Sequence, residues 1–334
     1  MKKFILIMFL FFSLLFILYG KIVSIPDLVN PNSIFIDKNN MYITEGTSIY
    51  IYSLKDFKLL KKFGEKGQGP GEFITLPGID MRLYILNNHL FINSISKVSI
   101  FTKKGIFVKE IRTKKRDADF QPMGKIFVGS SVIMKDKVQY QTINIYNANF
   151  KKIKEIFRQK APFQHNSLIT GFNPLIQLTS QFYSMYGRIF ISDNNGIIHV
   201  FEATGEEIFL IKYNFEKLKV TNNHKEEVYN YYKNHPGTKM IFEAIKTKIK
   251  FPKYFPYIRS YKVNDNRIYV LPYAKKNGMN CLYIFNMKGK LVKKVSVKIR
   301  ENNILELYPF FIKGRKLFQL VESEEKWELH IKSI

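Results

Sequence analysis

The stretch Phe63-Gly64-Glu65-Lys66-Gly67-Gln68-Gly69-Pro70-Gly71-Glu72-Phe73 holds four glycines and a proline within eight residues, the densest turn signal in the chain. Glycine adopts backbone angles that other residues resist, so the chain can leave one sheet here and enter the next. We interpret the stretch as the joint between two copies of a repeating β unit. The glycines and the proline shape the crossing, Glu72 is placed to cap backbone amides, and Phe73 anchors the joint in the core. The structural residues of the joint are therefore Gly67, Gly69, Pro70, Gly71, Glu72 and Phe73.

An aromatic residue at the end of a β-like segment, followed by a tight turn, is the clearest marker of the repeat. It recurs at Tyr52, Phe101, Tyr146, Phe201 and Phe285, and Ile331 takes its place in a sixth unit. The intervals are 45 to 55 residues, except for one of 84 residues that contains an insertion. Alternation of apolar and polar residues marks four strands in each unit. This period predicts an all-β fold, a six-bladed β-propeller of four-stranded blades.

Two units depart from the pattern. The sixth shows three strands before Ile334, and we expect Ile22-Val23-Ser24-Ile25 to supply the outer strand, which would close the ring and remove open sheet edges. The third unit, from about residue 124 to 157, fits worst. There Ser130-Ser131 stands where the other units have a turn containing Asn or Gly.

The long interval contains a helical insertion at about residues 221–257, between blades 4 and 5. Two helices are predicted, at 223–234 and 238–249, separated by His235-Pro236-Gly237 and with Thr238 as N-cap of the second. One face of the second helix carries Met240, Ile241, Ala244, Ile245 and Ile249. We expect this face to pack on the propeller, with contact to a partner or a membrane as the alternative.

Aromatic residues around the insertion suggest a binding rim, because insertions on one face of a repeat ring often border a binding site. The candidate binding residues are Tyr231, Tyr232, Tyr254, Tyr257 and Arg259. Tyrosines of this kind stack on sugars. Tyr is common throughout this chain, however, so packing at the rim is the alternative.

The first 20 residues have the pattern of a secretory signal peptide. Lys2-Lys3 precedes an apolar run from Phe4 to Leu18 that only Ser13 interrupts. The run is shorter than the roughly 20 apolar residues of a membrane-spanning helix. Cleavage after Gly20 would leave residues 21–334 as a single propeller domain in the periplasm or outside the cell. Because Leu18 is larger than the residue usually found there, an uncleaved N-terminal anchor is the alternative.

Charge and cysteine content limit the partners. The formal net charge is +26, and 44 of the 53 basic residues are lysine. Arginine is the residue best suited to bidentate phosphate and base contacts. We therefore expect a solvated lysine-rich surface and no specific nucleic-acid partner, and we leave weak contact with anionic lipid open. The only cysteine, Cys281, excludes an intramolecular disulfide, and its apolar neighbours predict a buried thiol.

Two segments resemble a known family. One is Gly67 to Phe73, between the first two units. The other is Phe251 to Gly289, with its Phe-Pro-x-Tyr-Phe-Pro approach and its Phe285-Asn286-Met287-Lys288-Gly289 hairpin. Both are similar to bacterial exported six-bladed β-propeller proteins of the NHL-repeat or TolB-like kind. The resemblance extends over essentially the whole chain after the signal, and it implies a fold and an exported location rather than a reaction.

No motif in the sequence indicates a particular reaction. The histidines and the cysteine lack metal-ligand spacing, and no nucleophile elbow, phosphate-binding loop or dinucleotide fingerprint occurs. We interpret Asp193-Asn194-Asn195-Gly196, which has oxygen ligands, as a hairpin turn rather than a calcium loop.

Three function classes remain. The first is an exported scaffold that binds a protein, peptide or glycan of the cell envelope through its funnel or its insertion-side face. The second is a calcium-dependent hydrolase like the six-bladed lactonases, and the third is a structural envelope protein. Acidic candidates for the hydrolase are Asp37, Asp80, Asp119 and Asp265, which fit turn chemistry equally well. We favour the scaffold, and we expect a monomer without a cofactor or a bound metal.

Overall fold

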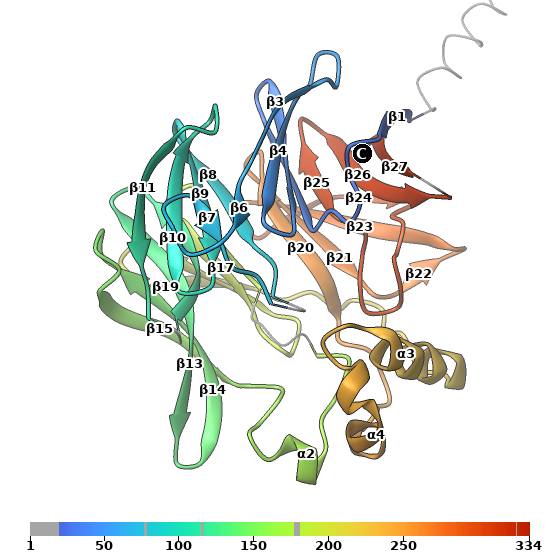
Figure 1. Cartoon of the computed structure of the whole chain (residues 1–334). Coiled ribbons are helices and arrows are strands. Elements are labelled where there is room, and N and C mark those ends of the chain that lie inside the picture. Colours follow the sequence, from blue (N-terminus) through green and yellow to red (C-terminus); the bar gives the residue numbers. More distant parts are fainter. Residues whose placement is uncertain (1–19, 77–78, 115–116, 177–180, 325) are drawn as a thin grey trace, which may run out of the picture.

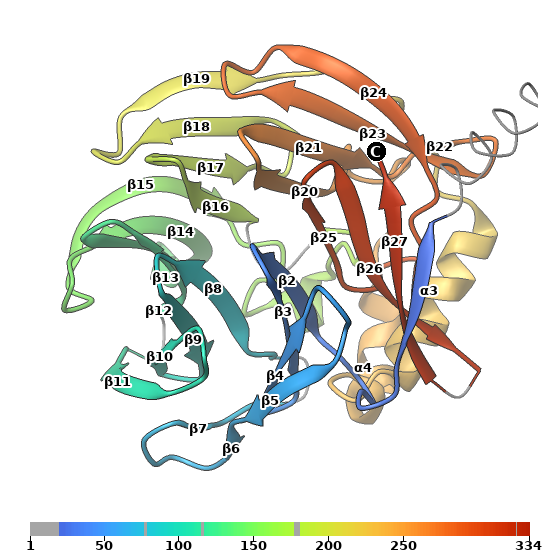
Figure 2. The same ribbon diagram turned by 90° about the horizontal axis from the view of Figure 1, so that it is seen from above.

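Six antiparallel sheets stand around a common centre in the computed structural model, which describes residues 20–76, 79–114, 117–176, 181–324 and 326–334 (Figures 1 and 2). The fold is an all-β, six-bladed propeller of four-stranded blades, as predicted. The first three blades consist of β2 Ser33–Asp37, β3 Asn40–Glu45, β4 Ser48–Ser53 and β5 Leu59–Phe63; β8 Arg82–Leu86, β9 His89–Ser94, β10 Lys97–Thr102 and β11 Phe107–Arg112; and β12 Asp117–Met123, β13 Ile126–Lys135, β14 Val138–Tyr146 and β15 Lys152–Lys160.

The other three blades complete the ring, and the insertion lies between blades 4 and 5, as predicted. They consist of β16 Phe182–Met185, β17 Arg188–Ser192, β18 Ile198–Glu202 and β19 Glu207–Ile211; β20 Ile258–Asn264, β21 Arg267–Pro272, β23 Met279–Asn286 and β24 Leu291–Val297, with the short β22 Lys275–Lys276 paired to β23; and β25 Phe310–Lys313, β26 Lys316–Ser323, β27 Lys326–Ser333 and β1 Lys21–Ile25.

The core lies between the blades rather than inside any one of them. Tyr42 and Ile51 of blade 1, for example, pack against Leu83 and Leu90 of blade 2 in one buried cluster. Both sides of a blade therefore face a neighbour, which explains why the middle strands are nearly continuous apolar runs. The outermost strands are exposed instead, as the exposed side chains of the basic strand β5 illustrate.

The two ends of the chain close the ring. β1 pairs antiparallel with β27, with Lys21 opposite Ile331 and Ile25 opposite Trp327. The first described strand is thus the outer strand of the last blade, as the sequence predicted. Trp327 strengthens this closure because its indole N–H donates a 2.8 Å hydrogen bond to the carbonyl of Val29.

The marker aromatics occupy one structural position in five blades. Each is buried at the end of the third strand, and the ladder to the fourth strand shifts register at that point, as expected of a β-bulge. The five residues are Tyr52, Phe101, Tyr146, Phe201 and Phe285. The bulge bends the outer strand into the following tight turn, so the sequence marker corresponds to a repeated backbone feature.

The propeller has two different faces. One face is formed by the short turns that join the first to the second strand and the third to the fourth strand of each blade, and we call it the turn face. The opposite face is formed by the connections between blades and by the turns that join second to third strands, and we call it the loop face. The helices α2 Ser167–Thr170, α3 Asn222–Asn234 and α4 Phe242–Ile245 all lie on the loop face (Figure 1). There the backbone of Phe172 exchanges hydrogen bonds with Lys248 and Lys250 at 2.9 and 2.8 Å, joining two inter-blade connections.

The insertion departs from its prediction in the second half. α3 forms as expected, with Thr221 as N-cap. The predicted continuous helix 238–249 is wrong: α4 is only four residues long, between the 3₁₀ turns η1 Lys239–Ile241 and η2 Lys246–Lys248. The Thr238 hydroxyl donates to the Tyr232 carbonyl at 2.7 Å instead of capping a helix. The predicted apolar face is consequently divided.

Exposure differs sharply along that predicted face. Ile245 and Ile249 are buried, whereas Met240 is 90% exposed and Ile241 is 49% exposed.

Two smaller predictions also need correction. In blade 3 the first strand is β12, and the turn that follows it is Gly124-Lys125, with Gly124 at φ 63°. The unit therefore begins before residue 124 and has an ordinary turn, while Ser130 and Ser131 lie within β13. The Cys281 side chain is half-buried rather than fully buried.

The predicted signal peptide or anchor, residues 1–20, lies almost wholly outside the described residues, which begin at Gly20. Among the described residues, no helix combines the length and the apolar character needed to cross a membrane.

Candidate functional site

The centre of the ring contains a group of hydrogen-bonded polar side chains, organised around an aspartate with a left-handed backbone conformation. Asp119 lies in the innermost strand of blade 3 with a left-handed φ of 56°, at a bulge where the ladder to β13 shifts register between Ala118 and Gln121. Bulges of this kind redirect a side chain, and residues in this backbone region concentrate at functional sites. The bulge aims the Asp119 carboxylate at blade 2.

That carboxylate binds two side chains of β8. Its Oδ2 accepts a 2.9 Å hydrogen bond from Nη1 of Arg82, and its Oδ1 accepts one from the Tyr84 hydroxyl. The Asp119 side chain is 9% exposed, whereas that of Arg82 is 47% exposed. The buried anion therefore positions a cation that keeps about half of its surface accessible.

Electrostatics fix the protonation of this group. Asp119 raises the pKa of Arg82 further above its ordinary value, and burial, followed by the charge of Asp119, raises the pKa of Tyr84. Arg82 is consequently always a cation and Tyr84 always a hydroxyl donor. A guanidinium has five N–H donors, so Arg82 can hold Asp119 and also receive an anionic group.

Aromatic side chains of the other inner strands surround this group. Phe35 of blade 1 lies 6.2 Å from the ring of Tyr84 and 5.6 Å from the ring of Phe311 in blade 6. The Lys262 ammonium of blade 5 lies 5.8 Å from the ring of Tyr183 in blade 4. We call this set the central cluster: Phe35, Arg82, Tyr84, Asp119, Tyr183, Lys262 and Phe311. All six blades contribute to it, and every member except Asp119 is at least partly exposed.

The insertion reaches the loop-face end of the central cluster. Tyr231 of α3 donates a 2.7 Å hydrogen bond to Glu306 in the connection between blades 5 and 6, and its ring stacks on His235 at 4.9 Å. Asp80 lies two residues before Arg82 and is exposed at the surface of a concave region. Partial burial raises the pKa of Asp80; the positive charge of Arg82 opposes this rise, and the negative charge of Glu306 adds to it. Three separate connections therefore meet near Arg82.

Tyr232 lies beside Tyr231, with ring centroids 5.5 Å apart, and the other predicted rim residues lie elsewhere. Tyr232 packs on Phe172 at 6.0 Å, and burial raises its pKa to about 12. Tyr254, 37% exposed, and Tyr257 flank the Lys217 ammonium at 5.6 and 5.3 Å. The predicted rim residues are thus not brought into a single site, and only Tyr231 approaches the central cluster.

Arg259, the fifth predicted rim residue, is internal. It is 3% exposed and forms an ion pair with Glu301. It also donates to the carbonyls of Asn303 and Ile304 at 3.1 and 3.2 Å. Arg259 therefore clamps the start of β20 to the connection between blades 5 and 6.

The glycine-rich joint has a compact internal structure. β6 Glu65–Lys66 and β7 Glu72–Phe73 form a short parallel pair, and Gly67 N–H donates to the Phe73 carbonyl at 3.0 Å. The Glu72 carboxylate accepts the Gly69 N–H at 2.8 Å. Phe73 is fully buried, 6.1 Å from the ring of Phe101. Gly71, after Pro70, has a φ of 77°. All six predicted joint residues thus lie in one crossing between blades 1 and 2.

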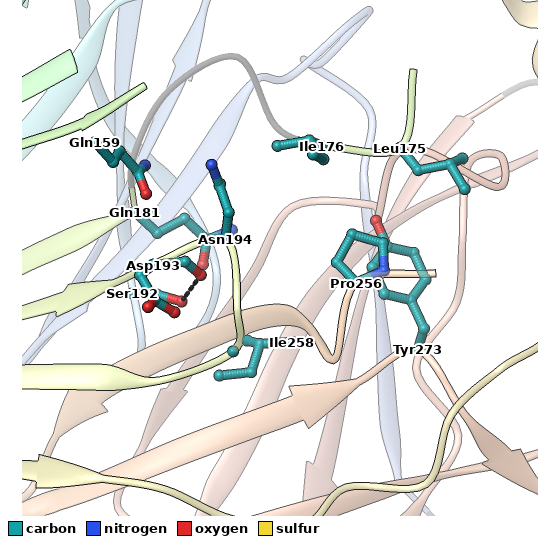
Figure 3. A pocket seen from close by; sticks show the side chains of 11 residues that line it. Gln159, Leu175, Ile176, Gln181, Ser192, Asp193, Asn194, Pro256, Ile258 and Tyr273 are labelled. Carbon is teal, nitrogen blue, oxygen red and sulfur yellow. Dashed lines mark hydrogen bonds between the residues drawn. The ribbon is translucent and has the colours of Figure 1, made fainter. Parts of the chain in front are cut away.

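Two cavities lie away from the central cluster. One of about 50 Å³ lies on the loop face, where Asp193 and Asn194 of blade 4 meet Gln181, Pro256 and Ile258 (Figure 3). This volume suits a few water molecules rather than a metabolite. A second cavity of about 290 Å³ lies beside blade 5 and is lined by Lys275, Lys276, Lys294, Cys281 and Tyr283, among others.

The acidic hydrolase candidates are dispersed. Asp37 pairs with Lys103 at 2.6 Å and Asp265 accepts the Gly314 N–H at 2.6 Å, both on the turn face. Asp80 and Asp119 lie toward the loop face. Across the described part of the chain, no three His, Cys, Asp or Glu side chains are placed to share a metal ion.

Sequence reasoning named Asp119 but missed its partners. Arg82, Tyr84, Tyr183 and Lys262 all lie in first strands, whose side chains a propeller gathers around its axis. The available signal was that Arg82 is one of only nine arginines in a lysine-rich chain and opens a first strand.

The protein is, in class, a six-bladed propeller scaffold with a polar and aromatic cluster at its centre. No protein-family model matches the sequence, and no curated protein sequence matches it. Among solved structures, BamB from Moraxella catarrhalis aligns with 91% of this chain and 73% of its own at 11% identity and a TM-score of 0.35.

BBS1N, solved in complex with ARL6DN and soaked with mercury, aligns with 92% of this chain and 79% of its own, at 13% identity and a TM-score of 0.40. Similarities at these scores carry no argument about function.

Proposed function

We propose that the protein is an exported scaffold that binds a polypeptide of the cell envelope on its loop face. One observation carries the proposal: the three most exposed large hydrophobic side chains of the described residues all lie in loop-face connections. They are Met240, Val29 and Ile169, at 90, 79 and 78% exposed. Exposed apolar side chains on one surface mark protein contacts more often than single scattered ones do.

The central cluster defines the chemistry of the partner. Arg82 opens onto the loop-face end of the ring and is held by Asp119, so a carboxylate of the partner would find a positioned guanidinium. Aromatic rings beside it suit an extended apolar or sugar-like group. A partner segment with an acidic residue next to an apolar one fits both features, and a glycan with a carboxylate is the second ligand of this kind.

The exported location and the relation to NHL-repeat or TolB-like propellers belong to the same proposal. They rest on the N-terminal apolar stretch, on the Gly67 to Phe73 joint and on the Phe285 to Gly289 hairpin. In this view residues 1–20 direct the chain out of the cytoplasm, and the propeller acts as a monomer in the envelope.

The test compares two faces of the protein by affinity capture from an envelope extract. The loop-face variant Ile169→Glu with Met240→Glu should lose the bound partner, since both side chains are exposed and their replacement leaves the core intact. The matched control is Ile153→Glu with Ile208→Glu, because these residues are 60 and 40% exposed on outer strands. An identical set of captured proteins from both variants would contradict the proposal and favour a structural envelope protein.

A second variant tests the central cluster. Arg82→Gln should weaken partner binding by roughly tenfold to a hundredfold, the range for a hydrogen bond to a charged group. Lys262→Gln, which leaves the Arg82 and Asp119 pair in place, should have a smaller effect. Calorimetric titration with the captured partner measures both. Equal affinities for Arg82→Gln and the wild type would exclude Arg82 from the site.

A further inference from the structure

We propose that the turn face docks on an anionic phospholipid surface, so that the loop face points away from the membrane. This inference is independent of the partner proposed for the loop face. It rests on the distribution of charge between the two faces, on the position at which the described chain begins, and on two exposed apolar or amphipathic side chains.

Basic residues are concentrated on the turn face. The eleven turns of this face that connect described strands contain ten Lys or Arg residues and three Asp or Glu residues, within 34 residues. The described residues of the loop-face connections include 17 basic and 13 acidic residues among 118 residues. The turn-face turns therefore carry the higher net positive charge, +7 against +4, in less than a third as many residues. Charge of this density attracts anionic lipid over a Debye length.

The basic side chains of the turn face are available. Nine of the ten are exposed, including the turn pairs Lys55 with Lys58 and Lys288 with Lys290. The tenth, Lys103, is half-buried and pairs with Asp37 at 2.6 Å. Because the turns are short and come from all six blades, they form a broad surface that several lipid headgroups can contact at once.

The described chain begins on the same face. The Lys21 ammonium lies 4.4 Å from the ring centre of Phe57, in the turn between β4 and β5, and β1 follows at once. In Figure 1, β1 lies at the opposite end of the molecule from α2, α3 and α4. The apolar stretch Phe4 to Leu18 precedes Gly20 by one residue in the sequence, so a retained stretch would reach a bilayer that lies against the turn face.

Two exposed side chains fit an interfacial position. Ile106, 57% exposed, follows the basic turn at Lys103 and Lys104, and Tyr186, 48% exposed, lies in the first turn of blade 4. Apolar side chains enter the headgroup boundary and tyrosine is enriched there. Lysines around them supply the electrostatic attraction.

The experiment measures co-sedimentation of the full chain with phosphatidylcholine vesicles, with and without phosphatidylglycerol. The difference between the two vesicles isolates the electrostatic contribution, because the N-terminal apolar stretch is common to both. The turn-face variant Lys288→Gln with Lys290→Gln should lose about tenfold or more of its partitioning onto anionic vesicles, from roughly fivefold for each basic residue near the surface. High salt should abolish the same difference.

The matched control removes the same charge from the loop face. Lys239→Gln with Lys246→Gln, both exposed, should change vesicle partitioning by less than about twofold. Equal losses in the two double variants would mean a general effect of net charge and would overturn the proposal, as would no loss in either.

Lysine acetylation on vesicles provides a second measurement. Lys288 and Lys290 should be protected while Lys239 and Lys246 react as in solution; the reverse pattern would place the loop face on the membrane. Loss of the polypeptide partner in Ile169→Glu with Met240→Glu should leave vesicle binding unchanged, so this proposal and the proposed function can fail separately.

Discussion

The two faces of the propeller use the same repeat for different purposes. On the turn face every connection is short, and positions such as Gly105, Gly205 and Gly289 recur with φ between 71 and 78°. On the loop face the connections range from two residues to the 46 between β19 and β20. The repeated turns of the turn face determine the shape of each blade. The loop face is not limited to such turns, and it carries the insertion, the most exposed apolar residues and the side of the ring on which Arg82 is accessible.

The comparison predicts that the largest losses of stability come from anchors of the loop face. Phe73→Ala removes a fully buried ring from the crossing between blades 1 and 2 and should lower the free energy of unfolding by about 3–5 kcal/mol. Phe57→Ala, in a turn-face turn and half-buried, should cost only about 1 kcal/mol. Denaturant unfolding of both variants measures the difference, and equal losses would show that the two faces are anchored alike.

A pair of glycine substitutions compares the faces at matched backbone geometry. Gly64 on the loop face and Gly124 on the turn face have φ of 92 and 63°. A Cβ at Gly64 would lie 2.5 Å from the Thr47 carbonyl oxygen, whereas one at Gly124 meets nothing within 4 Å. Gly124→Ala should cost about 1–2 kcal/mol for the left-handed backbone alone.

Gly64→Ala adds overpacking to that cost and should lose roughly 2–4 kcal/mol in total. Thermal unfolding of the two variants gives the ranking. A larger loss of stability for Gly124→Ala would mean that the turn-face backbone tolerates a side chain less well than the loop-face backbone does.

The buried clamp of the loop face gives the third effect. Glu301→Gln leaves the Arg259 cation buried without its carboxylate, although the carbonyls of Asn303 and Ile304 still accept from it. We expect a loss of about 2 kcal/mol in unfolding free energy, below the full cost of an unpaired buried charge because those two contacts persist.

Glu155→Gln is the control, because Glu155 pairs with Lys152 and Arg158 on an outer strand. It should cost less than about 1 kcal/mol. A larger loss of unfolding free energy for Glu155→Gln than for Glu301→Gln would show that Arg259 does not act as a structural clamp.

The turn face could be predicted from the sequence, and most of the loop face could not. Local chemistry determines the turns: an aromatic, a polar pair and a glycine repeat within a few residues, so Phe101 and Phe285 could be aligned without knowing any contact. The one error there, in blade 3, arose because Ser130-Ser131 was taken for the turn that Gly124-Lys125 makes.

The loop face depends on contacts between distant residues. Asp119 meets Arg82, 37 positions away, and Tyr231 meets Glu306, 75 positions away. No local sequence pattern indicates that the residues of either pair meet in the folded protein. The prediction of the second insertion helix was wrong for a related reason, since the Thr238 hydroxyl donates a hydrogen bond to the Tyr232 carbonyl across the preceding turn instead of capping a helix.

The smallest predicted effect is a pH dependence at the loop-face turn of blade 4. His199 Nε2 lies 3.5 Å from Asp193 and its Nδ1 lies 2.8 Å from Glu207, and the carboxylate of Asp193, helped by that of Glu207, raises the pKa of His199. A raised pKa in the folded state means that folding favours the protonated imidazole. This stabilisation is fully present below the unfolded-state pKa of about 6.5 and is lost as pH rises through the folded-state value.

His199→Phe keeps the packing against Phe157, whose ring lies 5.1 Å away, and removes the charge. The wild type should exceed this variant in unfolding free energy by up to about 1 kcal/mol at mildly acidic pH, and the difference should shrink as the solution becomes alkaline. Thermal melts of both proteins across that range measure it. A difference that grows with pH would show that Asp193 and Glu207 do not stabilise the imidazolium, and that packing alone keeps this turn in place.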